Sequence, residues 1–174
     1  MKRLIIIACV LLAAASFALA DNTTTLSVAV NAEASLTVTT GTTDLTTTGT
    51  NFTVPFTGTT AFTYQIRTTK SGGSGAITAK VTTDFGPAGG PSVGTPPSTG
   101  DALTYSCTVS SPASSCTGSP TASTTTGTSV ATFGSDARST KAGNSGSVAW
   151  SLTDDPVYAT GTYTAVVTFT ISAT

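Results

Sequence analysis

The sequence predicts an all-β protein, an immunoglobulin-like β-sandwich of about eight or nine antiparallel strands. Two long stretches, residues 161–172 and 26–38, alternate between apolar residues and small or hydroxyl-bearing ones. Shorter alternating stretches lie between them, separated by segments rich in Gly, Pro, Ser and Thr. Successive side chains of a strand point to opposite faces, so this pattern places one face on a core and the other in water. Many short strands with turns between them are typical of a sandwich.

The C-terminal stretch has the clearest alternation. Threonine dominates one face of this stretch, and threonine is common on the pleated surface of half-buried strands. We expect Phe62 and Trp150 to pack with the other face, whose residues form the core of the C-terminal strand: Tyr163, Ala165, Val167, Phe169 and Ile171.

The N-terminal stretch is too long for one ordinary strand, since residues 26–38 would extend about 43 Å. Two interpretations stay open. Residues 31–33 bend and pass an ordinary first strand from one sheet to the other, or residues 23–38 form an exchangeable strand that completes a neighbouring subunit. The side chains of that assembly strand would be Leu26, Val28, Val30, Ala32, Ala34, Leu36 and Val38.

The middle of the chain supplies the remaining strands. We expect an edge strand at 52–56, because Pro55 lacks an amide donor, and a hairpin formed by 62–66 and 77–81. Further strands are expected at 103–109, 130–133 and 148–152. Residues 86–100 and 137–146 should be loops, and residues 117–128 either a loop or a weak edge strand.

Residues 1–20 have the pattern of a signal peptide, with a basic start, an apolar run from Leu4 to Leu12 and the small-residue site Ala18-Leu19-Ala20. Residues 21–174 would then form a single β-sandwich domain. Lipidation at Cys9 is the less favoured alternative. No later segment is apolar enough to span a membrane, so we expect a secreted protein at the cell surface or outside the cell, with the periplasm as a stage in transit.

Charge is scarce, at 9% of residues. Removal of Lys2 and Arg3 leaves five of the seven basic residues against eight acidic ones, a formal net charge of −3. This balance offers no cationic surface for nucleic acid or for an anionic membrane. Hydroxyl groups therefore account for most of the polar surface.

Cys107 and Cys116 are the two cysteines of the expected mature chain. An even pair in an exported protein predicts a disulfide, here closing the tip of a hairpin around Pro112. Their spacing is not that of a redox or zinc motif, and the sequence has no histidine to share a metal. We expect no metal site and no cofactor.

The residues of common catalytic sites are missing as well. Without histidine, a serine or cysteine nucleophile lacks its usual base, and Gly-x-Ser-x-Gly does not occur. The acids are scattered apart from Asp154-Asp155, which is more typical of a turn than of a calcium loop. The sequence therefore predicts a protein that is not an enzyme.

Both long stretches carry a resemblance. The run Gly161-Thr-Tyr163-Thr-Ala-Val-Val-Thr-Phe-Thr-Ile resembles the last strand of chaperone–usher pilins and of spore-coat-U-like secreted subunits, and Gly161 lies fourteenth from the end, where those pilins place a glycine. Residues 23–38 are similar to their donor strand. The resemblance implies assembly into fibres by donor-strand exchange.

A weaker resemblance is to the WxL cell-wall-binding domain. Trp150-Ser-Leu152, followed by Tyr163 and Phe169-Thr-Ile171, is similar to its paired motifs, with Phe169 in place of the second tryptophan. This resemblance implies binding to peptidoglycan or another cell-wall glycan.

Together these observations predict a non-catalytic extracellular structural subunit of a fibre, pilus or surface matrix. Its expected partners are further copies of itself. The alternative is a surface domain that binds cell-wall glycan.

Overall fold

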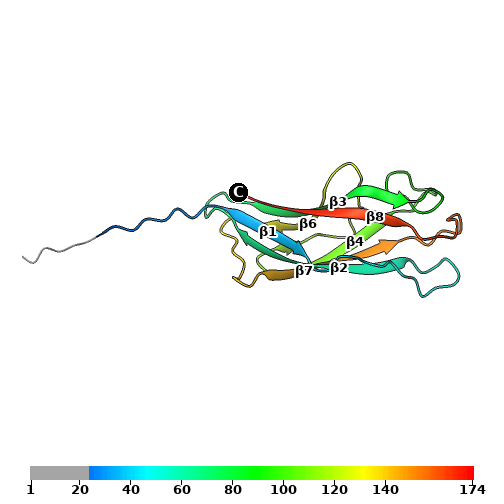
Figure 1. Ribbon diagram of the computed structural model, residues 1–174, viewed down its shortest axis with the longest axis horizontal. Coiled ribbons are helices and arrows are strands. Elements are labelled where there is room, and N and C mark those ends of the chain that lie inside the picture. Colours follow the sequence, from blue (N-terminus) through cyan, green and yellow to red (C-terminus); the bar gives the residue numbers. More distant parts are fainter. Residues whose placement is uncertain (1–23) are drawn as a thin grey trace, which may run out of the picture.

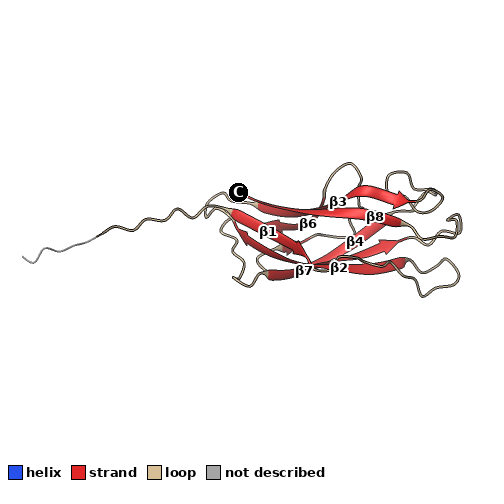
Figure 2. Ribbon diagram, viewed as in Figure 1, coloured by secondary structure: helices blue, strands red, loops and turns tan. Residues whose placement is uncertain are grey.

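The computed structural model describes residues 24–174 as an antiparallel β-sandwich, which confirms the predicted fold class (Figures 1 and 2). Two four-stranded sheets have the strand orders β1-β2-β7-β4 and β5-β6-β3-β8. The strands are β1 (Glu33–Val38), β2 (Phe56–Arg67), β3 (Gly75–Gly86), β4 (Leu103–Val109), β5 (Ser114–Ser115), β6 (Thr128–Phe133), β7 (Asn144–Leu152) and β8 (Thr164–Ala173). The predicted signal peptide and Cys9 lie outside the described residues.

The core lies between the inner faces of the two sheets. Strand β2 alternates along its length, so that Phe62, Tyr64 and Ile66 are buried. Trp150 of β7 is also buried, and its indole Nε1 donates a hydrogen bond to Thr60 Oγ1 at 2.8 Å. Every buried side-chain nitrogen and oxygen in the described part of the chain has a hydrogen-bond partner. The apolar inner face is thus continuous, and its few polar atoms are satisfied.

One side of the sandwich is closed covalently. Strand β4 is the edge of the first sheet and β5 the edge of the second. A disulfide joins Cys107 of β4 to Cys116, the residue after β5, with Cα atoms 5.5 Å apart. The amide of Cys116 donates to the carbonyl of Val130 at 2.9 Å. The disulfide therefore ties one sheet to the other, and does not close a hairpin tip as the sequence predicted.

The opposite side of the sandwich is formed by β1 and β8, which pack on each other without pairing. Strand β1 is only six residues long and pairs with residues 62–67 of β2, whereas β8 has ten residues. Inward positions of β8 are only half-buried, in contrast to those of β2 and β7. The sandwich is therefore incompletely covered along part of β8.

Two other expectations about the strands were wrong. Residues 62–66 and 77–81 do not form a hairpin, because β2 and β3 belong to different sheets and residues 68–74 cross between them. The predicted edge strand at 52–56 is not formed either, since β2 begins at Phe56. Phe52 has a φ of 60°, a left-handed conformation outside the β region of regular strands.

The described residues contain no helix, and thus none long and apolar enough to cross a membrane.

Candidate functional site

A groove of about 850 Å³ runs between the two sheets at the incompletely covered side. One lip is β8, from Thr164 to Phe169, and the other is the end of β1 with the loop 40–45 that follows it. Between the lips, the floor is apolar and is lined by Phe56, Phe85, Leu103, Trp150 and Leu152. We call this hollow the β8 groove.

The β8 lip has an unpaired backbone edge. Strand β8 is the last strand of its sheet, and within residues 24–174 it pairs only with β3. Its inward side chains Ala165, Val167 and Phe169 are half-buried. The ring of Phe169 reaches the core, with its centroid 5.9 Å from that of Phe62 and 6.4 Å from that of Trp150. An open edge beside an apolar surface is a template for one more strand.

A hydrogen-bonded pair of loops forms the end of the β8 groove. The Tyr158 hydroxyl donates to Asp101 Oδ2 at 3.0 Å, and the amide of Ala159 donates to the carbonyl of Gly89 at 2.8 Å. Burial, together with the charges of Asp101 and neighbouring acids, raises the pKa of Tyr158 well above its usual range, so that the phenol stays protonated as a donor. These bonds hold the loops that follow β3 and β7 against each other.

Asp84 fixes the turn that carries another part of the groove lining. Its carboxylate accepts hydrogen bonds from the amides of Phe85, Val93 and Gly94 and from the hydroxyl of Ser92, at 2.7–2.9 Å. Partial burial opposes ionisation, but the four donors outweigh it and lower the pKa of Asp84. Phe85 is thereby held in place at the groove floor.

Residues 24–32 form no strand and extend away from the sandwich (Figure 1). Leu26, Val28 and Val30 are 90%, 86% and 63% exposed. Their alternation is that of a strand with one apolar face, although nothing in the described part of the subunit covers that face. We call residues 24–32 the N-terminal segment.

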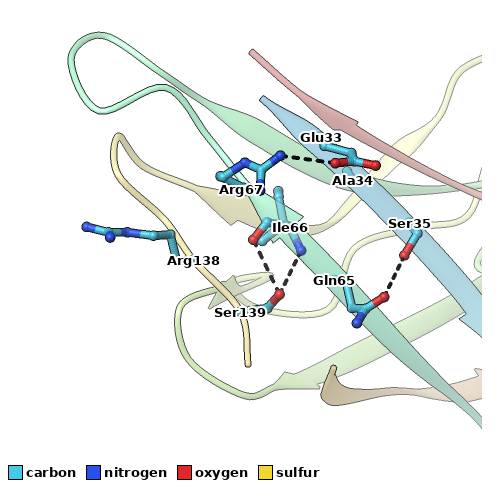
Figure 3. Close-up of a pocket in the computed structure, with 8 residues that line it drawn as sticks. All are labelled: Glu33, Ala34, Ser35, Gln65, Ile66, Arg67, Arg138 and Ser139. Atoms are coloured by element: carbon cyan, nitrogen blue, oxygen red, sulfur yellow. Dashed lines mark hydrogen bonds and ion pairs between the residues drawn. The ribbon is translucent and has the colours of Figure 1, made fainter. Parts of the chain in front are cut away.

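Arg67 holds the base of the N-terminal segment. Its Nε donates to the carbonyl of Asn31 at 2.7 Å, and its Nη2 lies 3.0 Å from Glu33 Oε2 (Figure 3). A hollow of about 350 Å³ beside this pair is lined by parts of β1, β2 and the loop at Arg138 and Ser139. In Figure 3 the side chain of Arg138 extends away from the other residues. The segment is thus free along most of its length and fixed where β1 begins.

The predicted assembly strand is divided by the structure. Ala34, Leu36 and Val38 belong to β1 and pair with β2 of the same subunit. Ala32 and the three apolar residues before it lie in the N-terminal segment. Of the predicted assembly strand 23–38, residues 24–32 are therefore unpaired and residues 33–38 are paired within the subunit. Residue 23 lies outside the described part of the chain.

The predicted inward residues of the C-terminal strand lie at the groove or along its continuation. Tyr163 precedes β8 and packs over Gly90, while Ala165, Val167 and Phe169 line the lip. Ile171 and Ala173 continue the same face toward the other end of the strand. Sequence reasoning missed Leu45, Phe56 and Phe85 as groove residues, and the one available signal was their apolar character next to turns.

The described residues bring together no group of three or more His, Cys, Asp or Glu side chains arranged to hold a metal ion. The geometry of the β8 groove suits an extended apolar chain, since it offers an unpaired strand edge and an apolar floor.

No protein-family model matches the chain, and no curated protein and no solved structure matches it.

Proposed function

We propose that this protein is a non-catalytic structural subunit of an extracellular fibre, in which the N-terminal segment of one copy fills the β8 groove of the next. The observation that carries the proposal is that one molecule has two complementary features, neither of which has a partner in the described part of the chain. One is an apolar alternating segment with no surface to cover it, and the other is an apolar groove beside an unpaired strand edge.

The dimensions of the two features support the proposal. Nine residues of extended chain span about 30 Å, and the β8 lip from Thr164 to Phe169 spans about 20 Å. The segment presents three apolar side chains at every second position, and the lip presents three inward positions at Ala165, Val167 and Phe169. Covering the segment's apolar side chains contributes about 1.5–3 kcal/mol each.

The positions of the two features favour a linear chain of subunits. The N-terminal segment leaves the end of the sandwich where β1 begins and β8 ends, whereas the groove lies toward the end where β8 begins (Figure 1). A contact between different surfaces at opposite ends is heterologous and does not close on itself. In this arrangement an inserted segment runs antiparallel to β8.

Export from the cell is part of the same proposal. It is supported by the signal-peptide pattern of residues 1–20 and by the Cys107–Cys116 disulfide, since such bonds persist mainly in oxidising compartments.

Glycan binding is the second candidate. Tyr158 and Tyr163 line the β8 groove together with Asp154 and Asp155, and aromatic rings beside carboxylates are a suitable surface for a sugar. However, Gly90 lies directly against the ring of Tyr163, so the loop already covers part of that ring. The groove floor is also more apolar than a sugar requires.

The test uses a synthetic peptide of residues 24–32 and the fluorescence of Trp150, the single tryptophan, which lies at the groove floor. Adding the peptide to full-length protein should change the Trp150 emission and inhibit self-assembly. Val28→Asp in the peptide should weaken binding at least about tenfold, because it removes an apolar contact and places a charge in the groove. Ala29→Asp is the matched control, since its side chain is on the opposite face of the strand.

Full-length Val28→Asp should no longer donate its segment but should still accept one. Added at a small molar fraction, it should therefore shorten wild-type fibres by capping them. Wild-type material should run as a ladder in detergent without boiling. The fibre proposal would be refuted if the wild-type protein stayed monomeric at high concentration and did not bind the peptide. Sedimentation of this monomer with purified peptidoglycan would then support glycan binding.

A further inference from the structure

The charged residues of this sparsely charged protein are sorted to the two ends of the sandwich. Four of the five described cations lie at the end where the N-terminal segment emerges: Arg67, Lys70, Arg138 and Lys141. Their location follows from the pairing of Glu33 with Arg67 in the β1–β2 register, the bridge between Arg67 and Arg138, and the hydrogen bond from Gln65 to the carbonyl of Lys141. Among the described acids, only Glu33 and Asp136 offset these cations, through ion pairs with Arg67 and Arg138.

The other end carries five carboxylates and no described Lys or Arg. Asp44 follows β1, Asp84 lies near the end of β3, Asp101 precedes β4, and Asp154 and Asp155 follow β7. Asp44 is exposed, Asp84, Asp154 and Asp155 are partly exposed, and Asp101 is buried. The fifth cation, Lys80, lies in the middle of β3. The two ends of the long axis thus differ in sign.

We infer that the two ends are complementary contact surfaces between copies of this chain, the cationic end of one copy docking on the anionic end of the next. The inference rests on the proposed function and adds the surface that orients the subunits before the segment inserts. The partner is a second copy because the cationic end carries the segment and the anionic end borders the groove that accepts it. Asp44, Asp154 and Asp155 line the β8 groove itself.

Opposite charges at the two ends have two physical consequences. They accelerate the encounter of correctly oriented copies, an effect that falls with ionic strength because the Debye length is about 10 Å at 0.1 M salt. They also disfavour the two wrong orientations, in which like charges meet. The N-terminal segment contains no charged residue, so its own insertion should not depend on salt.

The experiment measures the rate of fibre growth by light scattering for full-length variants at about 20 mM and about 500 mM NaCl. Lys70→Glu with Lys141→Glu reverses exposed charges at the cationic end, and Asp44→Lys with Asp154→Lys reverses those at the anionic end. Each pair should slow growth at least about tenfold at low salt and much less at high salt. Combining all four substitutions should restore growth, because the ends are again complementary. Lys80→Glu, which changes charge far from both ends, is the matched control and should grow like wild type.

The inference would be overturned if the two reversed variants grew fibres at the same rate as the Lys80→Glu control. It would also be overturned if the fourfold variant, shown to be folded by its Trp150 fluorescence, did not regain the wild-type growth rate. In either case, salt-independent binding of the 24–32 peptide would leave the fibre proposal standing. Wild-type subunits that do not assemble at low salt and do not bind the peptide would overturn both.

Discussion

The half-buried state of β8 makes a quantitative prediction about Phe169. In the isolated subunit its ring contacts Phe62 and Trp150 on one side and borders the β8 groove on the other. Removing a fully buried phenylalanine costs about 3–5 kcal/mol, which is the expectation for Phe62→Ala, since Phe62 is 1% exposed. Phe169→Ala removes roughly half as much packing and should cost about 2 kcal/mol.

The measurement is equilibrium urea denaturation followed by the fluorescence of Trp150, in a Val28→Asp background that prevents donation of the segment. Thr168→Ala is the matched control on the exposed face of β8, where the hydroxyl lies 3.0 Å from that of Thr82, and it should cost less than about 0.5 kcal/mol. The expected order of destabilisation is Phe62, Phe169, Thr168.

Two outcomes would contradict this reasoning. A cost for Phe169→Ala equal to that for Phe62→Ala would mean that the groove is closed in the isolated subunit. Equal costs for Phe169→Ala and Thr168→Ala would mean that the strand register is shifted by one residue, which exchanges the two faces.

Three further predictions follow from single features of the fold. Replacing Cys107 and Cys116 with serine should lower the free energy of unfolding by about 2.6 kcal/mol for a sequence separation of 9, and mass spectrometry of the wild type should find neither thiol free. The lowered pKa of Asp84 means that its carboxylate stabilises the folded state at pH values above the unfolded-state pKa of about 3.9. Asp84→Asn should therefore be less stable than the wild type by roughly 1 kcal/mol at pH 7. Below about pH 4 the wild type should lose more stability than Asp84→Asn does, so the difference between their free energies of unfolding should shrink. Gly146→Ala should destabilise by about 1–3 kcal/mol, because its Cβ would overlap the fully buried ring of Phe62. Gly134→Ala meets no atom within 4 Å and should be nearly neutral, and denaturation curves compare the two.

Much of the fold was accessible from local patterns in the sequence. The alternation from Ala165 to Ile171 is present in β8, and the stretches at 103–109 and 148–152 lie within β4 and β7. Such predictions succeed because the period of side-chain direction is a property of each strand alone. The disulfide between Cys107 and Cys116 was also predicted correctly, because these are the two cysteines of residues 21–174.

The tertiary structure decided which strands pair, and with that the candidate site. Nothing in the alternation of 26–38 says that 33–38 pairs with β2 while 24–32 does not, because both parts have the same period. The half-burial of Phe169 likewise depends on the length of β1, a strand more than a hundred positions away in the sequence.

Sequence by itself determined the kind of surface each segment carries: an apolar and hydroxyl alternation, few charges and a disulfide pair. Only the tertiary structure decided which apolar faces are covered and that the charges gather by sign at opposite ends of the sandwich. The physical reason is that side-chain direction is fixed locally by the backbone, whereas burial and charge placement are set by contacts between residues distant in the chain.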